Sequence, residues 1–385
     1  MRVLHSSSRI RQTLSVKKSI PTLYKISLAQ WTTTLTGLSS LTKSTTNIPI
    51  PTPGDHEVLV EIHAVSLNYR DVEVTKGEYT HHKSTSSIAP LEQKVPCSDM
   101  CGTVTHIGPN VTRFQPGDRV LSTFLPDHIT GQVTDKELAT GLGHPQPGVL
   151  ATHRVFPEHG LVKAPKHLGD VEASTLPIAS VTAWMSLEER IKLRSGRGAG
   201  EGGEVVVLLQ GTGGVAVAGL QIAKGLGATV IITSSSDEKL EKAKALGADY
   251  TINYRTTPDW DQEVLRITKG KGVDVILETG GARTLRKSFE CIAFGGLINC
   301  IGYLSGKVDD PEDRINVNLL ALRRTVTLQG IINGPRDRFE EMVGFYEEKG
   351  IKPVVSKVFG FEEADQAFRF LESGGHFGKV VIQVP

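Results

Sequence analysis

The feature that most constrains this chain is a glycine-rich turn between two apolar segments, within residues 204–253. Its small residues Gly211, Gly213 and Ala216 match the pattern G-x-G-x-x-G/A. The first glycine permits a tight turn, the second lets backbone approach a ligand, and the third small residue lets a helix pack on a sheet. The turn follows the apolar run 205–209, and small residues then recur at helical spacing, at Ala216, Gly219, Ala223 and Gly227. We therefore expect a strand, a turn, a helix and a second strand.

The start of that helix predicts a dinucleotide-binding site. The first backbone N–H groups of a helix have no partner within it, and they carry the positive end of the helix dipole. A pyrophosphate is therefore well held at such a turn. The alternative is a glycine turn within a purely structural α/β domain. The expected contact residues are Gly211, Thr212, Gly213, Gly214 and Val215.

The end of the second strand indicates which dinucleotide binds. An NAD site places Asp or Glu about 20 residues after the glycines, where it holds the ribose 2′-OH. This chain has Ser234 there, followed by Ser235 and Ser236, and Lys239 lies close by. No carboxylate repels a 2′-phosphate, and these groups can donate hydrogen bonds to it, so NADP(H) is favoured over NAD(H). A compatible alternative is that the serines cap the helix starting near residue 237 and that Lys239 is only solvated.

The pattern of segments predicts two domains. With 385 residues the chain exceeds the size at which one core keeps growing. Apolar segments at 250–253, 273–278, 297–301 and 326–328 extend the two strands around the glycine turn into a doubly wound, parallel α/β sheet. Before residue 180, short alternating strands such as 57–63 and 102–107 predict an antiparallel, barrel-like domain. A strand at 378–383 is expected to return to it.

The composition excludes several classes of protein. A hydrophobic content of 39% and a net charge of +1 exclude a disordered tail protein and give no electrostatic case for nucleic acid or an acidic membrane surface. No apolar run reaches membrane-spanning length. Neither nucleic acid nor a membrane is therefore expected as a partner. The cysteines Cys97, Cys101, Cys291 and Cys300 lack paired C-x-x-C spacing, so a reduced compartment is the default.

Residues 1–21 are expected to form a basic extension. No Asp or Glu precedes Asp55, whereas Arg and Lys are frequent before residue 26. Val3, Ile10 and Leu14 would share one helical face, as in a weak mitochondrial presequence. A disordered basic extension is equally consistent with the pattern. The expected location is the cytoplasm, with the mitochondrion as the alternative.

Segments along both halves together resemble the medium-chain dehydrogenase/reductase superfamily, specifically its zinc-independent, quinone-oxidoreductase-like branch. The resemblance covers residues 22–385 and is carried by 65–71 (VSLNYRD), 96–104 (PCSDMCGTV), 114–120 (FQPGDRV), 176–184 (LPIASVTAW), the turn QGTGGVA and 376–382 (HFGKVVI). It implies a GroES-like antiparallel β-barrel catalytic domain over 22–179 and a Rossmann domain over 180–330. It also implies a C-terminal return to the catalytic domain over 331–385, with substrate bound between the two domains.

The chain departs from the metal-dependent members of this family. Those members hold zinc with a Cys after the second barrel strand, a His-Glu pair, and a Cys near the helix that links the domains. The corresponding places here carry Asn68, Ser98 with Asp99, and Ile178 or Ala179. Zinc prefers thiolate and imidazole ligands, so no metal site is expected.

Without a Lewis acid, hydrogen-bond donors have to take up the negative charge that develops during hydride transfer. An activated C=C bond or a quinone suits this, because the charge delocalises onto an oxygen. The resemblance places Asn68 and Tyr69 as candidate donors, Asp71 as a residue that orients its neighbours, and Thr182 beside the nicotinamide ring. The alternatives are a packed aromatic for Tyr69, an ion pair of Asp71 with Arg70, and a helix-start hydroxyl for Thr182.

The resemblance also implies further cofactor contacts and a partner. Tyr254 would lie near the ribose phosphate, Gly280 and Ile301 near the nicotinamide ribose, and Phe377 with Lys379 over the centre of the cofactor; a surface position is the alternative for Lys379. We expect an NADPH-dependent oxidoreductase acting on a small molecule. An enoyl-thioester reductase, or an NADPH sensor or RNA-binding protein without turnover, is the alternative. A homodimer through the edge of the nucleotide-domain sheet would resemble the family.

Overall fold

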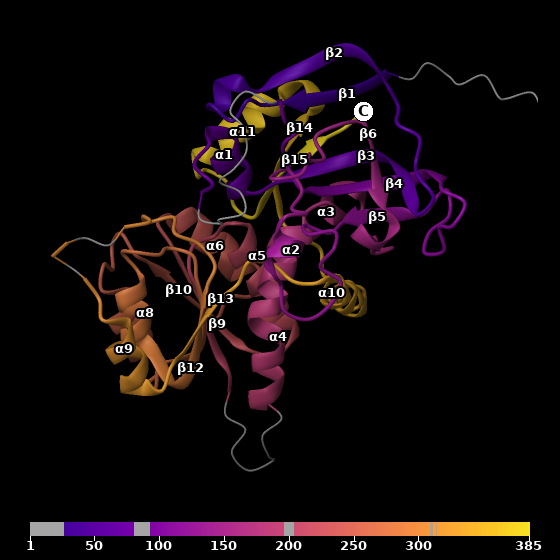
Figure 1. Cartoon of the computed structure of the whole chain (residues 1–385). Helices are drawn as coiled ribbons and strands as arrows, with labels where there is room; N and C mark the ends of the chain where they lie inside the picture. The colour runs from indigo at the N-terminus through magenta and orange to yellow at the C-terminus, as the bar shows by residue number, and fades with distance from the viewer. Residues whose placement is uncertain (1–26, 81–92, 196–203, 309–310, 313) are drawn as a thin grey trace, which may run out of the picture.

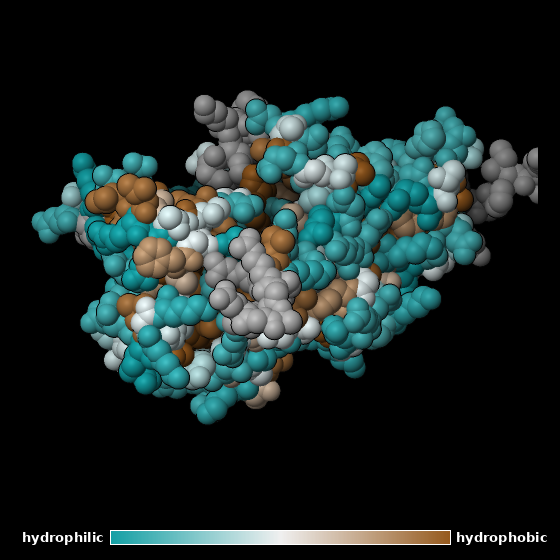
Figure 2. All heavy atoms as spheres, turned by 90° about the horizontal axis from the view of Figure 1, so that it is seen from below, coloured by the Kyte–Doolittle hydropathy of each residue, from teal (hydrophilic) through white to brown (hydrophobic). Residues whose placement is uncertain are grey.

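The computed structural model describes residues 27–80, 93–195, 204–308, 311–312 and 314–385. The expected basic extension and nearly all of the glycine-rich linker 195–203 lie outside these ranges. Figure 1 shows two parts, each built around its own sheet, with helix α4 running downward on the right-hand side of the lower part. On the face seen in Figure 2, hydrophilic side chains surround separate hydrophobic patches, several of them over the nucleotide-binding part on the left.

The nucleotide-binding part is a doubly wound parallel sheet in the order β10-β9-β8-β11-β12-β13. This is the Rossmann order, in which the chain reverses direction beside its first strand. The strands are β8 (Val206–Leu209), β9 (Thr229–Ser234), β10 (Tyr250–Asn253), β11 (Val273–Glu278), β12 (Ile292–Cys300) and β13 (Thr327–Gly330). The helices are α4 (Val181–Ser195), α5 (Gly214–Gly225), α6 (Asp237–Ala245), α7 (Trp260–Ile267), α8 (Leu285–Cys291) and α9 (Val317–Arg324).

Helix α5 lies on this sheet through its small residues, as the sequence predicted. A methyl group added at Gly219 would lie 3.1 Å from Cδ2 of Leu277, so the helix approaches β11 closely there. Ala216 and Ala223 are buried on the same helix. The prediction for Gly227 was wrong: α5 ends at Gly225, and Gly227 has a φ of 82°, a conformation that ends a helix.

The other part is a seven-stranded, mainly antiparallel sheet in the order β14-β15-β3-β4-β5-β7, with β6 paired to β3. Its strands are β3 (Glu57–Leu67), β4 (Asp99–Ile107), β5 (Arg119–Ser122), β6 (His153–Pro157), β7 (Leu161–Lys163), β14 (Val355–Gly360) and β15 (Lys379–Gln383), beside the hairpin of β1 (Ser27–Thr32) and β2 (Thr42–Pro49). The α-helices are α1 (Tyr69–Lys76), α2 (Asp135–Leu138), α3 (Asp170–Ala173), α10 (Arg336–Lys349) and α11 (Ala364–Glu372). Single turns are η1 (Leu38–Ser40), η3 (Glu158–Gly160), η5 (Phe361–Glu363) and the π-helical η4 (Leu176–Ser180).

The C-terminal segment joins the two parts. Strand β15 pairs antiparallel with β3, so that Val380 faces Leu67. One hydrophobic core runs across the junction, with Leu121 from the barrel, Trp184 from α4, Leu209 from β8 and Phe377 just before β15. This shared core holds the start of β15 beside the glycine turn.

Two expectations from composition can be compared with the structure. None of the helices within the described ranges is long and apolar enough to cross a membrane. Cys97, Cys101, Cys291 and Cys300 are free thiols.

Candidate active site

The glycine turn has the geometry that a pyrophosphate site requires. Gly211 has a φ of 76°, which a glycine adopts without strain, and α5 begins at Gly214 after the extended Gly213. The first amides of α5 therefore lie at the carboxyl end of β8, next to the ends of β9 and β11. The C-terminal segment lies against this turn, because the amide of Gly378 donates to the carbonyl of Thr212 at 3.1 Å. The residues present fit a dinucleotide, with the amides of Gly214 and Val215 available to its phosphates.

The serines after β9 take two different roles. Ser236 caps α6, since its hydroxyl accepts from the amide of Lys239 at 3.4 Å. Ser234 is buried, and its hydroxyl lies 3.4 Å from that of Thr212 on the glycine turn. The Nζ of Lys239 donates to the carbonyl of Gly374 at 2.6 Å. The helix-cap interpretation therefore holds for Ser236, while Ser234 and Lys239 stay with the proposed phosphate pocket.

The same strand end gathers Tyr254, Ser235 and a residue that the sequence did not single out, His376. The amide of Tyr254 donates to the carbonyl of Ser234 at 3.0 Å, and its side chain is exposed. Ser235 is half-buried. Burial, aided by the ammonium groups of Lys239 and Lys379, lowers the pKa of His376 to about 4. His376 is therefore neutral at pH 7, beside two cationic groups.

A buried carboxylate organises the ends of β11 and β12. Glu278 accepts hydrogen bonds from Nε2 of Gln210 at 2.7 Å and from the amides of Gly280 and Gly281 at 2.9 and 3.0 Å. The amide of Ile301 donates to the carbonyl of Glu278 at 2.9 Å. The predicted residues Gly280 and Ile301 thus lie beside the glycine turn, and Glu278 shapes the loop that carries Gly280.

The predicted catalytic residues near Asn68 lie at the start of α1. Tyr69 is 45% exposed, so it is not a packed aromatic. The carboxylate of Asp71 accepts from the amide of Asn68 at 2.8 Å and lies 3.3 Å from the guanidinium of Arg70. Burial raises the pKa of Asp71 to about 6, against the attraction of Arg70. The geometry places Asp71 as a group that holds Asn68 and the helix start in position.

Thr182 is buried at the start of α4. Its hydroxyl lies 3.4 Å from Nδ2 of Asn333, which also donates to the carbonyl of Pro177 at 3.1 Å. The carbonyl of Thr182 accepts from the hydroxyl of Ser186 at 2.7 Å. Thr182 is thus tied to the C-terminal segment through Asn333, a partner that the sequence did not reveal.

Lys379 does not lie on the surface. Its Nζ donates to the carbonyl of Leu67 and to Oδ1 of Asn68, both at 2.6 Å. The carboxylate of Asp99 is buried nearby, accepting from the amide of Ile178 at 3.1 Å and from the hydroxyl of Ser98 at 2.7 Å. The side chain of Lys379 is therefore buried beside Asn68 and does not face solvent. Phe377, by contrast, packs its ring into the core that the two parts share.

A further contact across the junction was not predicted. The hydroxyl of Tyr303, just after β12, donates to the carboxylate of Glu73 on α1 at 2.9 Å. Lys307 lies 3.0 Å from the same carboxylate. These are common residue types more than 200 positions apart, so no motif announces the contact. It fixes α1, and with it Tyr69, against the nucleotide-binding part.

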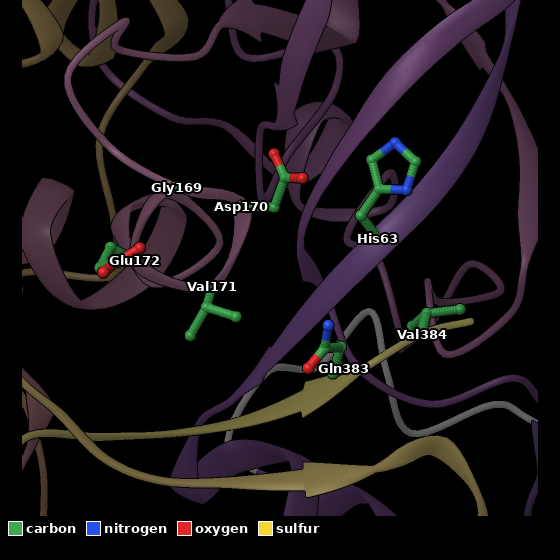
Figure 3. Close-up of a pocket in the computed structure, with 7 residues that line it drawn as sticks. All are labelled: His63, Gly169, Asp170, Val171, Glu172, Gln383 and Val384. Carbon is green, nitrogen blue, oxygen red and sulfur yellow. The ribbon is translucent and has the colours of Figure 1, made fainter.

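A surface recess of about 430 Å³ lies elsewhere, on the barrel (Figure 3). It is lined by His63 of β3, by Asp170 and Glu172 of α3, and by Gln383 of β15, and it contains none of the predicted site residues. The carboxylate of Asp170 is already paired with Arg119 at 2.6 Å. This recess is therefore not the candidate active site.

Comparisons with known proteins agree with this geometry. Residues 54–166 match the family described as alcohol dehydrogenase GroES-like domain, and residues 214–348 match that described as zinc-binding dehydrogenase. A zinc-type alcohol dehydrogenase-like protein of Schizosaccharomyces pombe is 40% identical over 85% of this chain and 91% of its own length. The solved structure of a putative alcohol dehydrogenase from Sinorhizobium meliloti is 41% identical, with a TM-score of 0.80 over 92% of this chain and 98% of that one.

Reductases are also similar to this chain. A quinone oxidoreductase-like protein 2 homologue of Nematostella vectensis is 26% identical over 86% of this chain and 82% of its own length. The solved structure of the JamJ enoyl reductase is 25% identical, with a TM-score of 0.72 over 93% of this chain and all of that one. Together with the barrel, the Rossmann sheet and the glycine turn, these relationships show that the chain belongs to the medium-chain dehydrogenase/reductase superfamily of NAD(P)-dependent oxidoreductases.

Proposed function

We propose that this protein is an NADPH-dependent reductase that delivers hydride to an activated C=C bond or a quinone without a metal ion. One observation carries the proposal. The resemblance puts the zinc places of metal-dependent relatives at Asn68, at Ser98 with Asp99, and at Ile178 or Ala179. Here Asp99 accepts from Ser98 and from the amide of Ile178, and Oδ1 of Asn68 accepts from Lys379, which leaves Nδ2 of Asn68 as a donor. Such a site offers an oxyanion hydrogen-bond donors, not a Lewis acid.

The reaction requires these residues to hold substrate and to supply a proton. Reduced nicotinamide, when bound, supplies the hydride that adds to an electron-poor carbon. The negative charge then passes to the substrate oxygen, where the amide of Asn68 can donate a hydrogen bond. Tyr69, exposed at the start of α1, is our candidate for the group that delivers a proton. One hydride and one proton complete the reduction of the acceptor.

The preference for NADPH rests on the pocket after β9. Ser234 stands where an NAD enzyme carries a carboxylate, and Lys239 and His376 lie near this strand end. One similar solved structure, 34% identical with a TM-score of 0.79 over 93% of this chain and all of that one, is described as an NAD-dependent alcohol dehydrogenase. Because that protein is described as NAD-dependent, the preference of this chain for NADPH over NADH has to be tested at Ser234.

An enoyl-thioester reductase is the second candidate. The similarity to the JamJ enoyl reductase extends over nearly the whole chain, and that likeness favours an enoyl acceptor. A thioester carbonyl polarises a C=C bond as a ketone does, so the same donors serve both.

The oxidation of NADPH, followed by absorbance, tests the proposal with three acceptors: a quinone, a simple enone and an enoyl thioester. We expect turnover with at least one of them, and the fastest acceptor defines the substrate class. Tight binding of NADPH without turnover on any acceptor would refute the enzyme proposal and favour a sensor. Equal activity after prolonged treatment with a chelator is expected, and loss of activity that zinc restores would contradict the metal-free mechanism.

A further inference from the structure

The end of β3, the start of β4, the π-helical turn η4 and the start of β15 meet at one buried point. Asn68 directly follows β3, Asp99 begins β4, and η4 supplies the amide of Ile178, which donates to Asp99 at 3.1 Å. By the resemblance, the places that hold zinc in metal-dependent relatives fall here, at Asn68, at Ser98 with Asp99, and at Ile178 or Ala179. The fourth segment brings Lys379, whose Nζ lies 2.6 Å from Oδ1 of Asn68.

The groups at this point do not fit zinc. An ammonium is a donor only and cannot ligate a metal, and Asn68 offers it a neutral amide oxygen instead of a thiolate. Each carboxylate oxygen of Asp99 accepts a hydrogen bond, one from the hydroxyl of Ser98 and the other from the amide of Ile178. Within the described ranges, no group of three or more His, Cys, Asp or Glu side chains is placed to hold a metal.

Lys379 also decides which way the Asn68 amide faces. Because an ammonium only donates, the atom that faces it must be Oδ1, which turns Nδ2 in the other direction. Nδ2 is buried and makes no well-formed hydrogen bond in the structure. Its weak interaction is with Asp99, where a hydrogen bond from Asn68 lowers the pKa of the carboxyl, against the dominant effect of burial. A buried donor without a well-placed partner is costly, and a ligand oxygen would satisfy it better.

We propose that the ammonium of Lys379 is the resident cation of this site: it takes the place of the catalytic zinc of metal-dependent relatives and orients Asn68 so that its Nδ2 meets the substrate oxygen. Lys379 is thus a positioning residue, acting through Asn68. The inference deepens the proposed function and rests on it for the substrate oxygen. The cation's position does not depend on which acceptor is reduced.

The charges around Lys379 are consistent with a retained cation. Burial lowers the pKa of Lys379, whereas Asp99 on β4, Asp71 on α1 and Cys97 before β4 act to raise it. His376, on the segment that leads into β15, is neutral at pH 7 because its pKa lies near 4. Lys379 therefore compensates Asp99, while Arg70, 3.3 Å from Asp71, compensates the second carboxylate.

The first test removes the charge with Lys379→Met and compares it with Lys352→Met, a matched change at an exposed lysine of the same C-terminal segment. We expect kcat of Lys379→Met to fall by about 10- to 100-fold, the usual cost of losing a group that orients an active-site residue. The KM for NADPH should change by less than about threefold. Lys352→Met should behave as wild type. A large rise in the KM for NADPH with unchanged kcat would show a cofactor-binding role and overturn the proposal.

Loss of Lys379 also leaves Asp99 buried without its cation, so a fall in activity could reflect poor folding. The double variant Lys379→Met/Asp99→Asn removes both charges and should recover the melting temperature that the single variant loses. We expect its kcat to stay low. Recovery of activity together with stability would show that the pair is only structural.

A double-mutant cycle tests whether Lys379 acts through Asn68. Asn68→Ala should lower kcat at least as much as Lys379→Met, and the two changes together should cost no more than Asn68→Ala alone, because both remove one donor. Fully additive losses would contradict this.

The zinc content of wild type after dialysis against zinc and desalting gives a readout that needs no substrate. Less than a tenth of an equivalent of zinc supports a resident lysine, and one equivalent overturns the proposal. If wild type reduces no acceptor, the proposed function fails, while the zinc measurement still decides the position of the cation.

Discussion

The two sides of the active-site junction are built in opposite ways. On the nucleotide side, the groups that we propose for phosphate binding are backbone amides of one continuous segment, from Gly211 into α5. On the barrel side, the functional groups are side chains from separate segments, with Asn68, Asp99 and Lys379 brought together only in the folded chain. Backbone donors are independent of residue type, whereas the barrel site depends on each side chain and on the compensation of its buried charges.

Because of this difference, the two sites are sensitive to different substitutions. The glycine turn loses its geometry only if its backbone is strained or the space beside it is filled. The barrel site loses its arrangement if one charge is removed or one segment shifts. The start of β15 belongs to both sides, since Gly378 contacts the glycine turn and Lys379 enters the barrel site. Substitutions there should therefore have the largest effects on the protein.

The largest effect is expected for Gly378→Ala. Gly378 has a φ of 81°, and an added Cβ would lie 2.4 Å from the carbonyl oxygen of Val354. Strain and overlap together should lower the free energy of unfolding by about 3 kcal/mol or more. Gly374→Ala is the control, because Gly374 has a φ of 68° but open space around it, and should cost about 1 kcal/mol. Equal losses in chemical denaturation would mean that β15 does not need its close contact.

The second effect is a dependence of stability on pH that comes from His376, on the segment leading into β15. The pKa of His376 is about 4, below its usual 6.5, so between these values the folded protein binds fewer protons than the unfolded chain. Stability is then lost as pH falls from 6.5 towards 4, by at most about 3 kcal/mol, and this contribution is constant above pH 7.

The measurement is the difference in unfolding free energy between wild type and His376→Gln as a function of pH. We expect the variant to lose less stability than wild type across this range. His106→Gln, at an exposed histidine of the barrel, serves as the control and should follow the wild-type curve. A curve for His376→Gln that also follows wild type would mean that burial of the ring has little energetic weight.

The same contrast explains what the sequence predicted. The Rossmann strands and the glycine turn follow from local apolar runs and one motif. Each strand overlaps its expected range, although β12 spans Ile292–Cys300 rather than 297–301 and β13 spans Thr327–Gly330 rather than 326–328. The separation of Ser236 from Ser234 needed three-dimensional contacts, because a cap and a phosphate ligand look alike in sequence. The inward turn of Lys379 arises from the pairing of β15 with β3, and the contact of Tyr303 with Glu73 arises where the two parts meet; no local pattern encodes either.

The nucleotide side can be tested alone through Ser234→Asp. A carboxylate at the end of β9 would repel a 2′-phosphate and accept hydrogen bonds from a ribose 2′-OH. We expect the ratio of kcat/KM for NADPH over NADH to fall by about 10- to 100-fold. Ser234→Ala removes the hydroxyl without adding charge and should change the ratio by only a few fold. An unchanged ratio in Ser234→Asp would refute the assignment of this pocket.

The smallest effect is expected at the edges of the two sheets, where we propose that the chain forms a homodimer through β13. Both β13 and β14 are end strands of their sheets, and each carries a partly exposed apolar residue: Leu328 at 37% and Val358 at 42%. Leu322, on the neighbouring α9, is 72% exposed and Phe294 of β12 is 71% exposed, which gives the nucleotide side the larger apolar surface near its edge. A lysine on an edge strand opposes pairing with another strand.

Leu328→Lys should therefore weaken self-association by about tenfold, or about 1.4 kcal/mol, in sedimentation or light-scattering measurements across a range of concentrations. Val358→Lys makes the same change on the barrel edge and should leave the association unaltered. Dissociation caused by Val358→Lys alone would show that the interface lies on the barrel. A wild-type chain that stays monomeric at every concentration would contradict the homodimer proposal. Neither substitution touches the junction, so turnover per chain should be preserved, and a loss of turnover on dissociation would show that the rigidity of the nucleotide sheet depends on its partner.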